Sequence, residues 1–407
     1  MKEIIYSVLL FVFSPFASLL LSIRNIFVNK YCVYLIGAFF SVFGAFLPPT
    51  SDAYRYRELY YSTHIFTQNW SNLWTRDRDF LFQFLSSVFN SAGVPFEYFK
   101  FLLLFCCYSL YSWMFLDIVK NNPAISDNKK TFGLAVLSLF LSIRFFTLTA
   151  GIRFGVASTI VIVAIYLFYK KAYVKSVALY VISITMHYSM LVILPFAVMA
   201  VLLSRVSIPI TVKYVIILVL IATSQTAIGQ ILTYFFPENN LIAGGVSTYI
   251  EGHWGTAEIM KSASFGGLIF TLVRILPVIP LTIIVLKRTE ADRFLADISF
   301  LLIVLLCVSF SSITLLLRYS NVTIAILFVV LLLTTTDSQK ALNELRISLL
   351  SFIIMFGCYA YTQRATLARF ELHYRSIISP ITLIGDYKYT DEWVQENLDS
   401  KGEYYQR

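Results

Sequence analysis

The chain has 407 residues, of which 58% are hydrophobic and only 14% are charged, whereas soluble domains carry about 25% charged residues. This composition excludes a water-soluble enzyme. The net charge of +9 does not indicate nucleic-acid binding, because Lys and Arg are scattered among short loops between apolar runs; it indicates anionic membrane lipid as a partner.

Apolar runs of about 18 or more residues recur along the whole chain, and each is long enough for a transmembrane helix. The predicted fold class is therefore all-α, a polytopic integral membrane helix bundle of about 12 transmembrane segments. The predicted segments are 4–23, 31–48, 98–118, 131–148, 154–169, 174–187, 189–204, 211–232, 266–286, 296–314, 319–335 and 346–363. Residues 80–92 are predicted to form a short helix at the membrane interface.

The first segment is interpreted as a retained helix and not as a secretory signal. The charges of Lys2 and Glu3 cancel, and no small-x-small cleavage site precedes Arg24. Residues 1–363 then form one membrane domain with outer loops 49–79 and 235–264, and residues 364–407 form a polar C-terminal tail.

Loops rich in Lys and Arg stay on the cytoplasmic side of a membrane. In this chain all the Lys- and Arg-rich short loops face the cytoplasmic side if residues 174–204 form two short helices that turn near His187. A single long helix through Pro195 is the alternative, and it would invert the topology downstream. With two helices, both termini, the two long loops and Arg144, Arg153 and Arg318 face outward.

The loop 49–79 combines acidic, basic and aromatic side chains. Aromatic faces suit the apolar faces of sugar rings, while charged edges suit hydroxyls and phosphates. An interfacial aromatic belt with solvated ion pairs is the alternative. The residues that we single out for glycan binding are Tyr54, Arg55 and Asp79, and Asp52 is a candidate base.

Arg153 opens an otherwise apolar helix. A guanidinium at membrane depth costs about 2.5–3.5 kcal/mol on insertion scales unless it is paired or lines a polar cavity. We interpret it as a clamp for a lipid pyrophosphate; a side chain that snorkels to the interface is the alternative. Arg144 and Arg318 have the same two interpretations.

His187 lies deepest in apolar sequence among the four histidines. Its unperturbed pKa is near neutral, which suits a general base acting on a sugar hydroxyl, although a lone histidine is more often a buried hydrogen-bonding residue. His253 and Trp254, in YIEGHWG, are candidates for the acceptor-glycan site or simple loop residues.

The sequence has no P-loop, dinucleotide glycine fingerprint, HExxH or GxSxG motif, and no His or Cys spacing of a metal site. Neither a cofactor nor a metal is expected. A series of other motifs occurs in order: SDAYRYRELYY, DFLFQFLSSVFNSAGVPFEYFKFLLLF, TAGIRFGVASTIVIVAIYLFYKK, ITMHYSMLVILPF and LLLRYSN.

This order resembles the EpsG-like branch of the Wzy family, bacterial polymerases of O-antigen, capsule or exopolysaccharide. The resemblance covers most of residues 40–330. The family's Arg followed by a small residue corresponds to Arg153 and Ala157, its His-x-Ser to His187 and Ser189, and its late Arg to Arg318. Family members often have Glu-Pro-Gly where this chain has Arg78, Asp79 and Phe80.

The resemblance implies an enzyme, a metal-independent glycosyltransferase with a GT-C-like fold in the bacterial inner membrane. It would join undecaprenyl-pyrophosphate-linked oligosaccharides on the periplasmic face by transferring the growing chain to an incoming repeat unit. Arg153 and Arg318 would hold the pyrophosphate, Arg144 would support them, and His187 or Asp52 would activate the acceptor hydroxyl. A chain-length regulator and a flippase are further candidate partners.

Three other functions stay open on the sequence. A glycan ligase and a membrane acyltransferase that uses the histidine as base are the alternatives among enzymes. A transporter or flippase for lipid-linked glycan is the third, and it would be expected to contain inverted repeats and broken helices.

Overall fold

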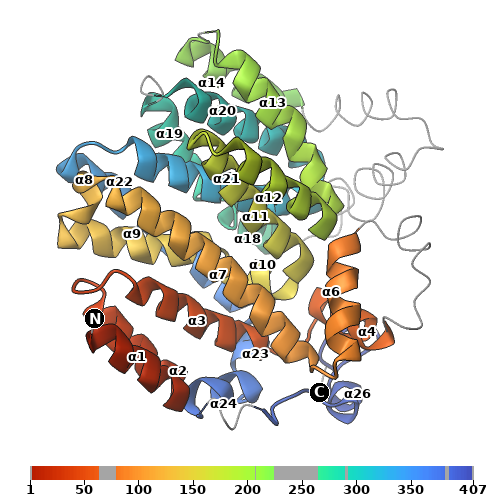
Figure 1. Ribbon diagram of the computed structural model, residues 1–407. Helices are drawn as coiled ribbons and strands as arrows, with labels where there is room; N and C mark the ends of the chain where they lie inside the picture. Colours follow the sequence, from red (N-terminus) through yellow and green to blue (C-terminus); the bar gives the residue numbers. More distant parts are fainter. Residues whose placement is uncertain are drawn as a thin grey trace. The chain divides into compact units, whose positions relative to one another are not determined.

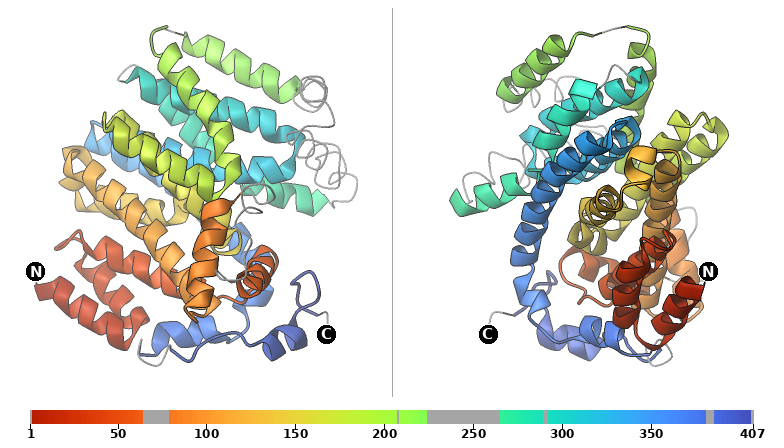
Figure 2. Two further views of the ribbon diagram at one scale, coloured as in Figure 1. Left: turned by 45° about the vertical axis from the view of Figure 1, so that its right-hand side comes forward. Right: turned by 90° about the vertical axis from the view of Figure 1, so that its left-hand side faces the viewer.

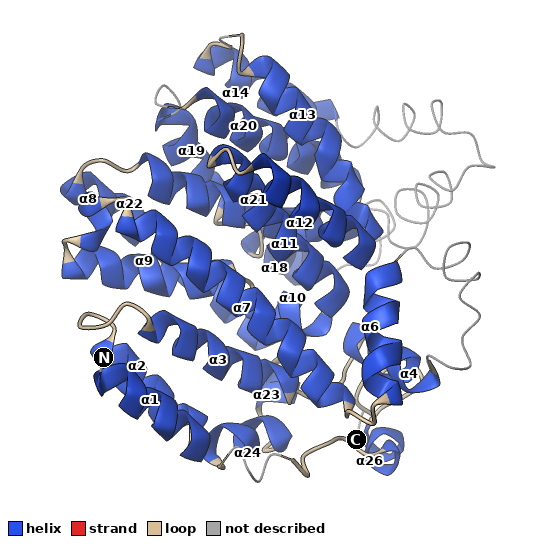
Figure 3. Ribbon diagram, in the orientation of Figure 1, coloured by secondary structure: helices blue, strands red, loops and turns tan. Residues whose placement is uncertain are grey.

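The computed structural model describes residues 2–63, 79–206, 208–223, 265–288, 292–380 and 385–405. Over these residues the secondary structure is helical, without β-strands (Figures 1 and 3), which confirms the predicted all-α class. The chain divides into two compact units. The first comprises Met1–Asn121, Ile143–Leu191 and Ala360–Arg407, and the second comprises Asn122–Ser142 and Val192–Tyr359.

The helices of the first unit are α1 (Lys2–Phe13), α2 (Pro15–Asn25), α3 (Cys32–Ala45), α4 (Asp52–Ser62), α6 (Phe80–Ser91), α7 (Phe96–Lys120), α10 (Phe145–Ala150), α11 (Ile152–Tyr169), α12 (Tyr173–Met186), α23 (Arg364–Leu367), α24 (Leu372–Ile378) and α26 (Asp391–Asn397). Those of the second are α8 (Pro123–Ser126), α9 (Lys129–Ser142), α13 (Ile193–Leu203), α14 (Ile210–Thr223), α18 (Phe265–Val273), α19 (Val278–Arg288), α20 (Arg293–Val308), α21 (Ile313–Thr334) and α22 (Ser338–Thr362), whose last residues belong to the first unit.

Among the described residues, six stretches are helical, long and apolar enough to cross a membrane: Phe96–Lys120, Lys129–Ala150, Ile152–Tyr169, Ile269–Arg288, Ile313–Thr334 and Ser338–Thr362. The chain is therefore an integral membrane protein. Each of these six matches a predicted segment. The predicted segments 31–48, 174–187, 189–204 and 296–314 form shorter apolar helices, such as α3 with 14 residues, about 21 Å against a hydrocarbon core of about 30 Å. Residues 224–232 of the predicted segment 211–232 and the predicted outer loop 235–264 lie outside the described residues.

The predicted single helix over 4–23 is wrong, because the chain turns at Ser14 and Pro15. Ser14 has an extended backbone, and its side chain accepts a hydrogen bond from the amide of Ala17 as the N-cap of α2. The Ser18 hydroxyl donates to the carbonyl of Ser7 at 2.7 Å. Helices α1 and α2 therefore pack as a hairpin beside α3, as two directions of view show (Figures 1 and 2).

The stretch 174–204 is not one continuous helix. Helix α12 ends at Met186, His187 has an extended backbone with φ −154° and ψ 112°, and a 3₁₀ turn, Tyr188–Val192, leads into α13. The two short helices that we predicted are confirmed, with the break at His187. This break places the imidazole at a helix end, where polar groups of the chain can reach it.

Small residues let α11 pack tightly in the first unit. Ser183 and Ser176 on α12 donate hydrogen bonds of 2.7 Å to the carbonyls of Ala157 and Ala164 on α11. At Gly155 a Cβ would lie 2.5 Å from a side-chain carbon of α10 and 3.0 Å from its backbone. The glycine therefore permits the sharp junction of α10 and α11, which fixes where α11 begins.

The second unit is organised around α21, which packs against α9, α19 and α20. Nearly every residue between Val322 and Leu332 is buried. Asn122 donates two hydrogen bonds of 2.8 Å to the carbonyls of Leu332 and Thr335. These bonds satisfy carbonyls at the end of α21 and attach α8 to it.

The C-terminal segment folds onto the first unit. Helix α24 packs against α2 and α3. The hydroxyl of Tyr389 donates to the carbonyl of Phe46 at 2.9 Å, and its amide donates to Glu97 at 3.1 Å. The buried guanidinium of Arg57 donates to the carbonyl of Tyr389 at 2.8 Å and pairs with Asp391 at 2.7 Å. Residues after α23 thus support α3 and α4.

Candidate functional site

An ion pair joins the first residues of two helices in the first unit. Asp79 is the N-cap residue of α6, and Arg153 lies in the first turn of α11. Arg153 Nη1 is 2.8 Å from Asp79 Oδ2. The guanidinium also lies over the ring of Tyr56 on α4, 4.5 Å from its centroid, and 5.8 Å from that of Phe82. The pair therefore has an aromatic floor.

His187 lies at the other oxygen of the same carboxylate. Its Nδ1 is 3.7 Å from Asp79 Oδ1, which is beyond hydrogen-bond length. The backbone amide of Tyr188 donates to Oδ1 at 3.1 Å. The break after α12 thus brings the imidazole and a backbone amide to Asp79, and the edge of Phe154 packs against the imidazole with 5.6 Å between ring centroids.

The amide of Ser189 donates to His187 Nδ1 at 3.3 Å, and the Ser189 hydroxyl lies 3.1 Å from the same nitrogen. A neutral imidazole that accepts this bond carries its proton on Nε2. A base at Nε2 needs the other tautomer, with the proton on Nδ1. Asp79 Oδ1 lies on that side, and it must move closer than 3.7 Å to accept the Nδ1 hydrogen.

The site is only partly closed to solvent. The side chains of Asp79, His187 and Arg153 are 11%, 15% and 26% exposed. A guanidinium has five N–H donors. Arg153 uses donors for Asp79 and Tyr56, and its Nε is buried, so an anionic ligand would contact the remaining Nη hydrogens. Asp52, at the start of α4, interacts electrostatically with Arg153 and pairs with Arg55 at 3.7 Å.

The structure thus brings together three of the residues singled out from the sequence: Asp79, Arg153 and His187. Asp52 pairs with Arg55, whose side chain is exposed. Tyr54 lies elsewhere on α4, against Gly402 of the C-terminal segment.

Arg144, the residue before α10, is buried and has a left-handed backbone conformation, with φ 35° and ψ 66°. An L-residue costs about 1–2 kcal/mol in this conformation, so the surrounding packing must hold it. Arg318 is half-buried on α21 of the second unit. His253 and Trp254 lie outside the described residues.

Sequence reasoning missed Tyr56 and Phe82, which form the aromatic floor, and it gave Ser189 no role. Tyr56 stands within the quoted motif SDAYRYRELYY, but its helical spacing alone does not show which tyrosine faces inward.

On the same helix, burial raises the pKa of Tyr60, and its hydroxyl donates to the carbonyl of Val94 at 2.6 Å. This bond ties α4 to the start of α7.

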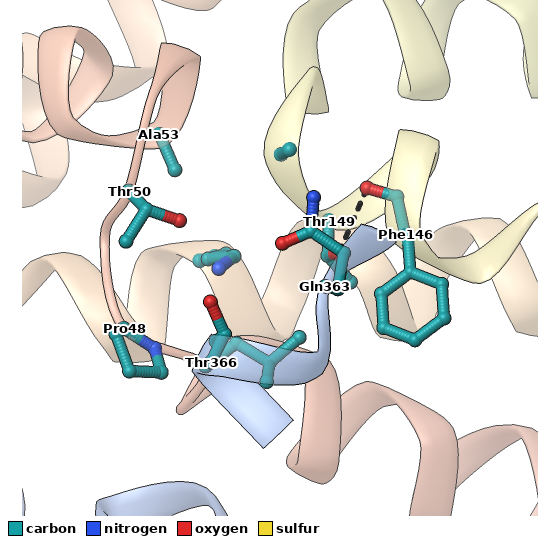
Figure 4. Close-up of a pocket in the computed structure, with 10 residues that line it drawn as sticks. Pro48, Thr50, Ala53, Phe146, Thr149, Gln363 and Thr366 are labelled. Carbon is teal, nitrogen blue, oxygen red and sulfur yellow. Dashed lines mark hydrogen bonds between the residues drawn. The ribbon is translucent and has the colours of Figure 1, made fainter. Parts of the chain in front are cut away.

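A small cavity of about 20 Å³ lies at the start of α4 in the first unit, between Thr50, Thr149, Gln363 and Thr366 (Figure 4). Lys100, whose side chain is buried, also lines it. This volume admits about one water molecule, so the cavity cannot hold a sugar. Among the described residues, no three His, Cys, Asp or Glu side chains gather in the arrangement of a metal site.

The family model of the EpsG family, a family of exopolysaccharide and O-antigen polymerase-like proteins, matches residues 29–376. This range includes Asp79, Arg153 and His187. No curated protein and no solved structure matches the chain.

Proposed function

The chain belongs to the EpsG family, and on that premise we propose that it is a membrane glycosyltransferase that polymerises undecaprenyl-pyrophosphate-linked oligosaccharide repeat units. It transfers the growing chain to an incoming repeat unit on the periplasmic face of the bacterial inner membrane. Family membership and the apolar helical architecture support a polysaccharide polymerase. The single observation that carries the proposed site is the contact of one carboxylate, Asp79, with Arg153 and His187.

The donor side of the reaction needs positive charge. As the bond between the anomeric carbon and the pyrophosphate oxygen breaks, negative charge develops on the leaving pyrophosphate, and fixed donors lower the barrier. We assign this role to the guanidinium of Arg153, which Asp79 and the Tyr56 ring hold in place. The roles of Arg144 and Arg318 as additional pyrophosphate ligands belong to the same proposal and rest on the sequence.

The acceptor side needs a base. A hydroxyl of the incoming repeat unit attacks the anomeric carbon from the face opposite the pyrophosphate, its proton passes to the base, and the configuration inverts. We propose His187 or Asp52 for this role. His187 would use Nε2, and Asp79 would close from 3.7 Å to accept the hydrogen of Nδ1. Asp52 is a half-exposed carboxylate at the start of α4.

The experiment compares the polymer that cells make with each variant at matched protein levels. Arg153→Lys keeps the charge but loses the fork of N–H donors, and we expect about a hundredfold loss of polymer, as for loss of a donor to developing charge. Arg24→Lys, at the exposed end of α2, is the matched control. Normal ladders from Arg153→Lys would refute the role of Arg153.

The two candidate bases are distinguished by His187→Gln and Asp52→Asn, since polymer should be lost only when the true base is replaced.

The product that accumulates in an inactive variant decides between a polymerase and a glycan ligase. A polymerase defect leaves single repeat units attached to the final acceptor, whereas a glycan ligase defect leaves finished polymer unattached.

A further inference from the structure

A cavity of about 440 Å³ lies in the second unit, where three helices begin or end. Lys213 lines it from the first turn of α14, Lys287 from the last turn of α19, and Arg293 from the first residue of α20. The candidate membrane span Ile269–Arg288 ends at this point. The cavity therefore lies at a membrane boundary, where lipid headgroups are found.

The cationic side chains around the cavity are not all neutralised. Lys213 pairs with the acidic lining residue Asp297 at 2.8 Å, and both are buried. Arg288 next to the cavity pairs with Glu344. Lys287 and Arg293 are exposed, and with the described residues neither of them forms an ion pair. With respect to the part of the chain that the structure describes, two positive charges thus remain available to a ligand.

Helix ends and apolar side chains complete the surroundings. Helices α14 and α20 both begin at the cavity, so their amides add partial positive charge. Asp292 caps part of α20 by accepting a hydrogen bond from the amide of Leu295 at 3.1 Å. Val206 and Ile210 line the cavity and are exposed. Such a site offers charge to a phosphate and apolar contact to its alkyl ester.

We propose that this cavity binds the phosphate group of an anionic phospholipid, with Lys287 and Arg293 contacting the phosphate and the Lys213–Asp297 pair forming the floor. The volume falls in the range of about 300–1,000 Å³ typical of small-molecule sites. All residues that line the cavity belong to the second unit, and none of them is a residue proposed for glycosyl transfer.

The test is native mass spectrometry of the purified full chain titrated with phosphatidylglycerol or, separately, with the zwitterionic phosphatidylcholine. We expect wild-type protein to bind one phosphatidylglycerol more tightly than any phosphatidylcholine. The double variant Lys287→Gln/Arg293→Gln should lose about thirtyfold in affinity, because each cation near a lipid surface contributes about fivefold, or about 1 kcal/mol.

Lys129→Gln/Lys130→Gln is the matched control, since it removes the same charge from exposed positions at the start of α9 in the same unit. This control should bind phosphatidylglycerol like the wild type. Equal affinity for the two lipids, or equal loss in both double variants, would overturn the proposal. Inorganic phosphate that displaces the lipid at equal concentration would overturn the assignment to a lipid and identify free phosphate as the ligand.

Discussion

Asp79→Asn is the most direct test of the proposed site, because one carboxylate contacts both functional side chains. The substitution keeps the shape of the side chain and an oxygen for the amide of Tyr188, but it removes the charge opposite Arg153. Arg153 then loses its ion pair at 2.8 Å, and His187 loses the carboxylate oxygen 3.7 Å from its Nδ1.

The stability cost follows from the exposure of the pair. A hydrogen bond to a charged group contributes about 1.5–3 kcal/mol when it is buried. The Arg153 side chain is 26% exposed, so water compensates part of the loss, and Asn can still accept a neutral hydrogen bond. We therefore expect the free energy of unfolding to fall by about 1 kcal/mol. Polymer synthesis should fall at least tenfold, more than this cost explains.

Asp117→Asn provides the matched control in the same unit. Asp117 accepts a hydrogen bond from the hydroxyl of Tyr166 and pairs with Lys170 at 3.5 Å, so its replacement also breaks a partly exposed ion pair. The two assays are thermal unfolding of the purified protein and polymer ladders in cells at matched protein levels. Equal loss of polymer in both variants, or normal ladders from Asp79→Asn, would refute the proposed role of Asp79.

Three further predictions concern stability, each measured by thermal unfolding of the purified full chain. Gly155→Ala should lower the free energy of unfolding by about 1–3 kcal/mol, since the new Cβ would lie 3.0 Å from the backbone of α10. Gly357→Ala, where a Cβ would meet no atom within 4 Å, should raise it by about 0.5–1 kcal/mol. A more stable Gly155→Ala than Gly357→Ala would contradict the packing. Arg57→Met should lower the free energy of unfolding by about 2–3 kcal/mol and Asp391→Asn by under about 1 kcal/mol, because the arginine is buried and the aspartate is 77% exposed. Equal losses in the two variants would contradict this role of burial. Burial and a nearby lysine lower the pKa of His373 to about 4, whereas a histidine in the unfolded chain has a pKa of about 6.5. The unfolded chain therefore binds the proton more readily, and the free energy of unfolding should fall as the pH drops from about 6.5 to about 4. A His373→Leu variant with the same pH profile would show that another group is responsible.

The residues of the proposed site show how far the sequence argument reaches. A guanidinium within apolar sequence needs a polar partner, and Arg153 has one in Asp79. The break near His187 was predicted because two short helices place the Lys- and Arg-rich loops on one side of the membrane. The same reasoning could not identify Tyr56, since α4 is polar overall and its apolar pattern does not show which ring faces Arg153.

The sequence by itself determined that the chain is a helical membrane protein, because lipid offers no partner for backbone amides and long apolar runs must therefore satisfy them within helices. It also determined the order of the family's motifs. Only the tertiary structure decided that Asp79 lies between Arg153 and His187. That contact joins residues far apart in the chain, and it depends on how α6, α11 and α12 pack, through particular glycines and serines that hydropathy does not distinguish from any other small residue.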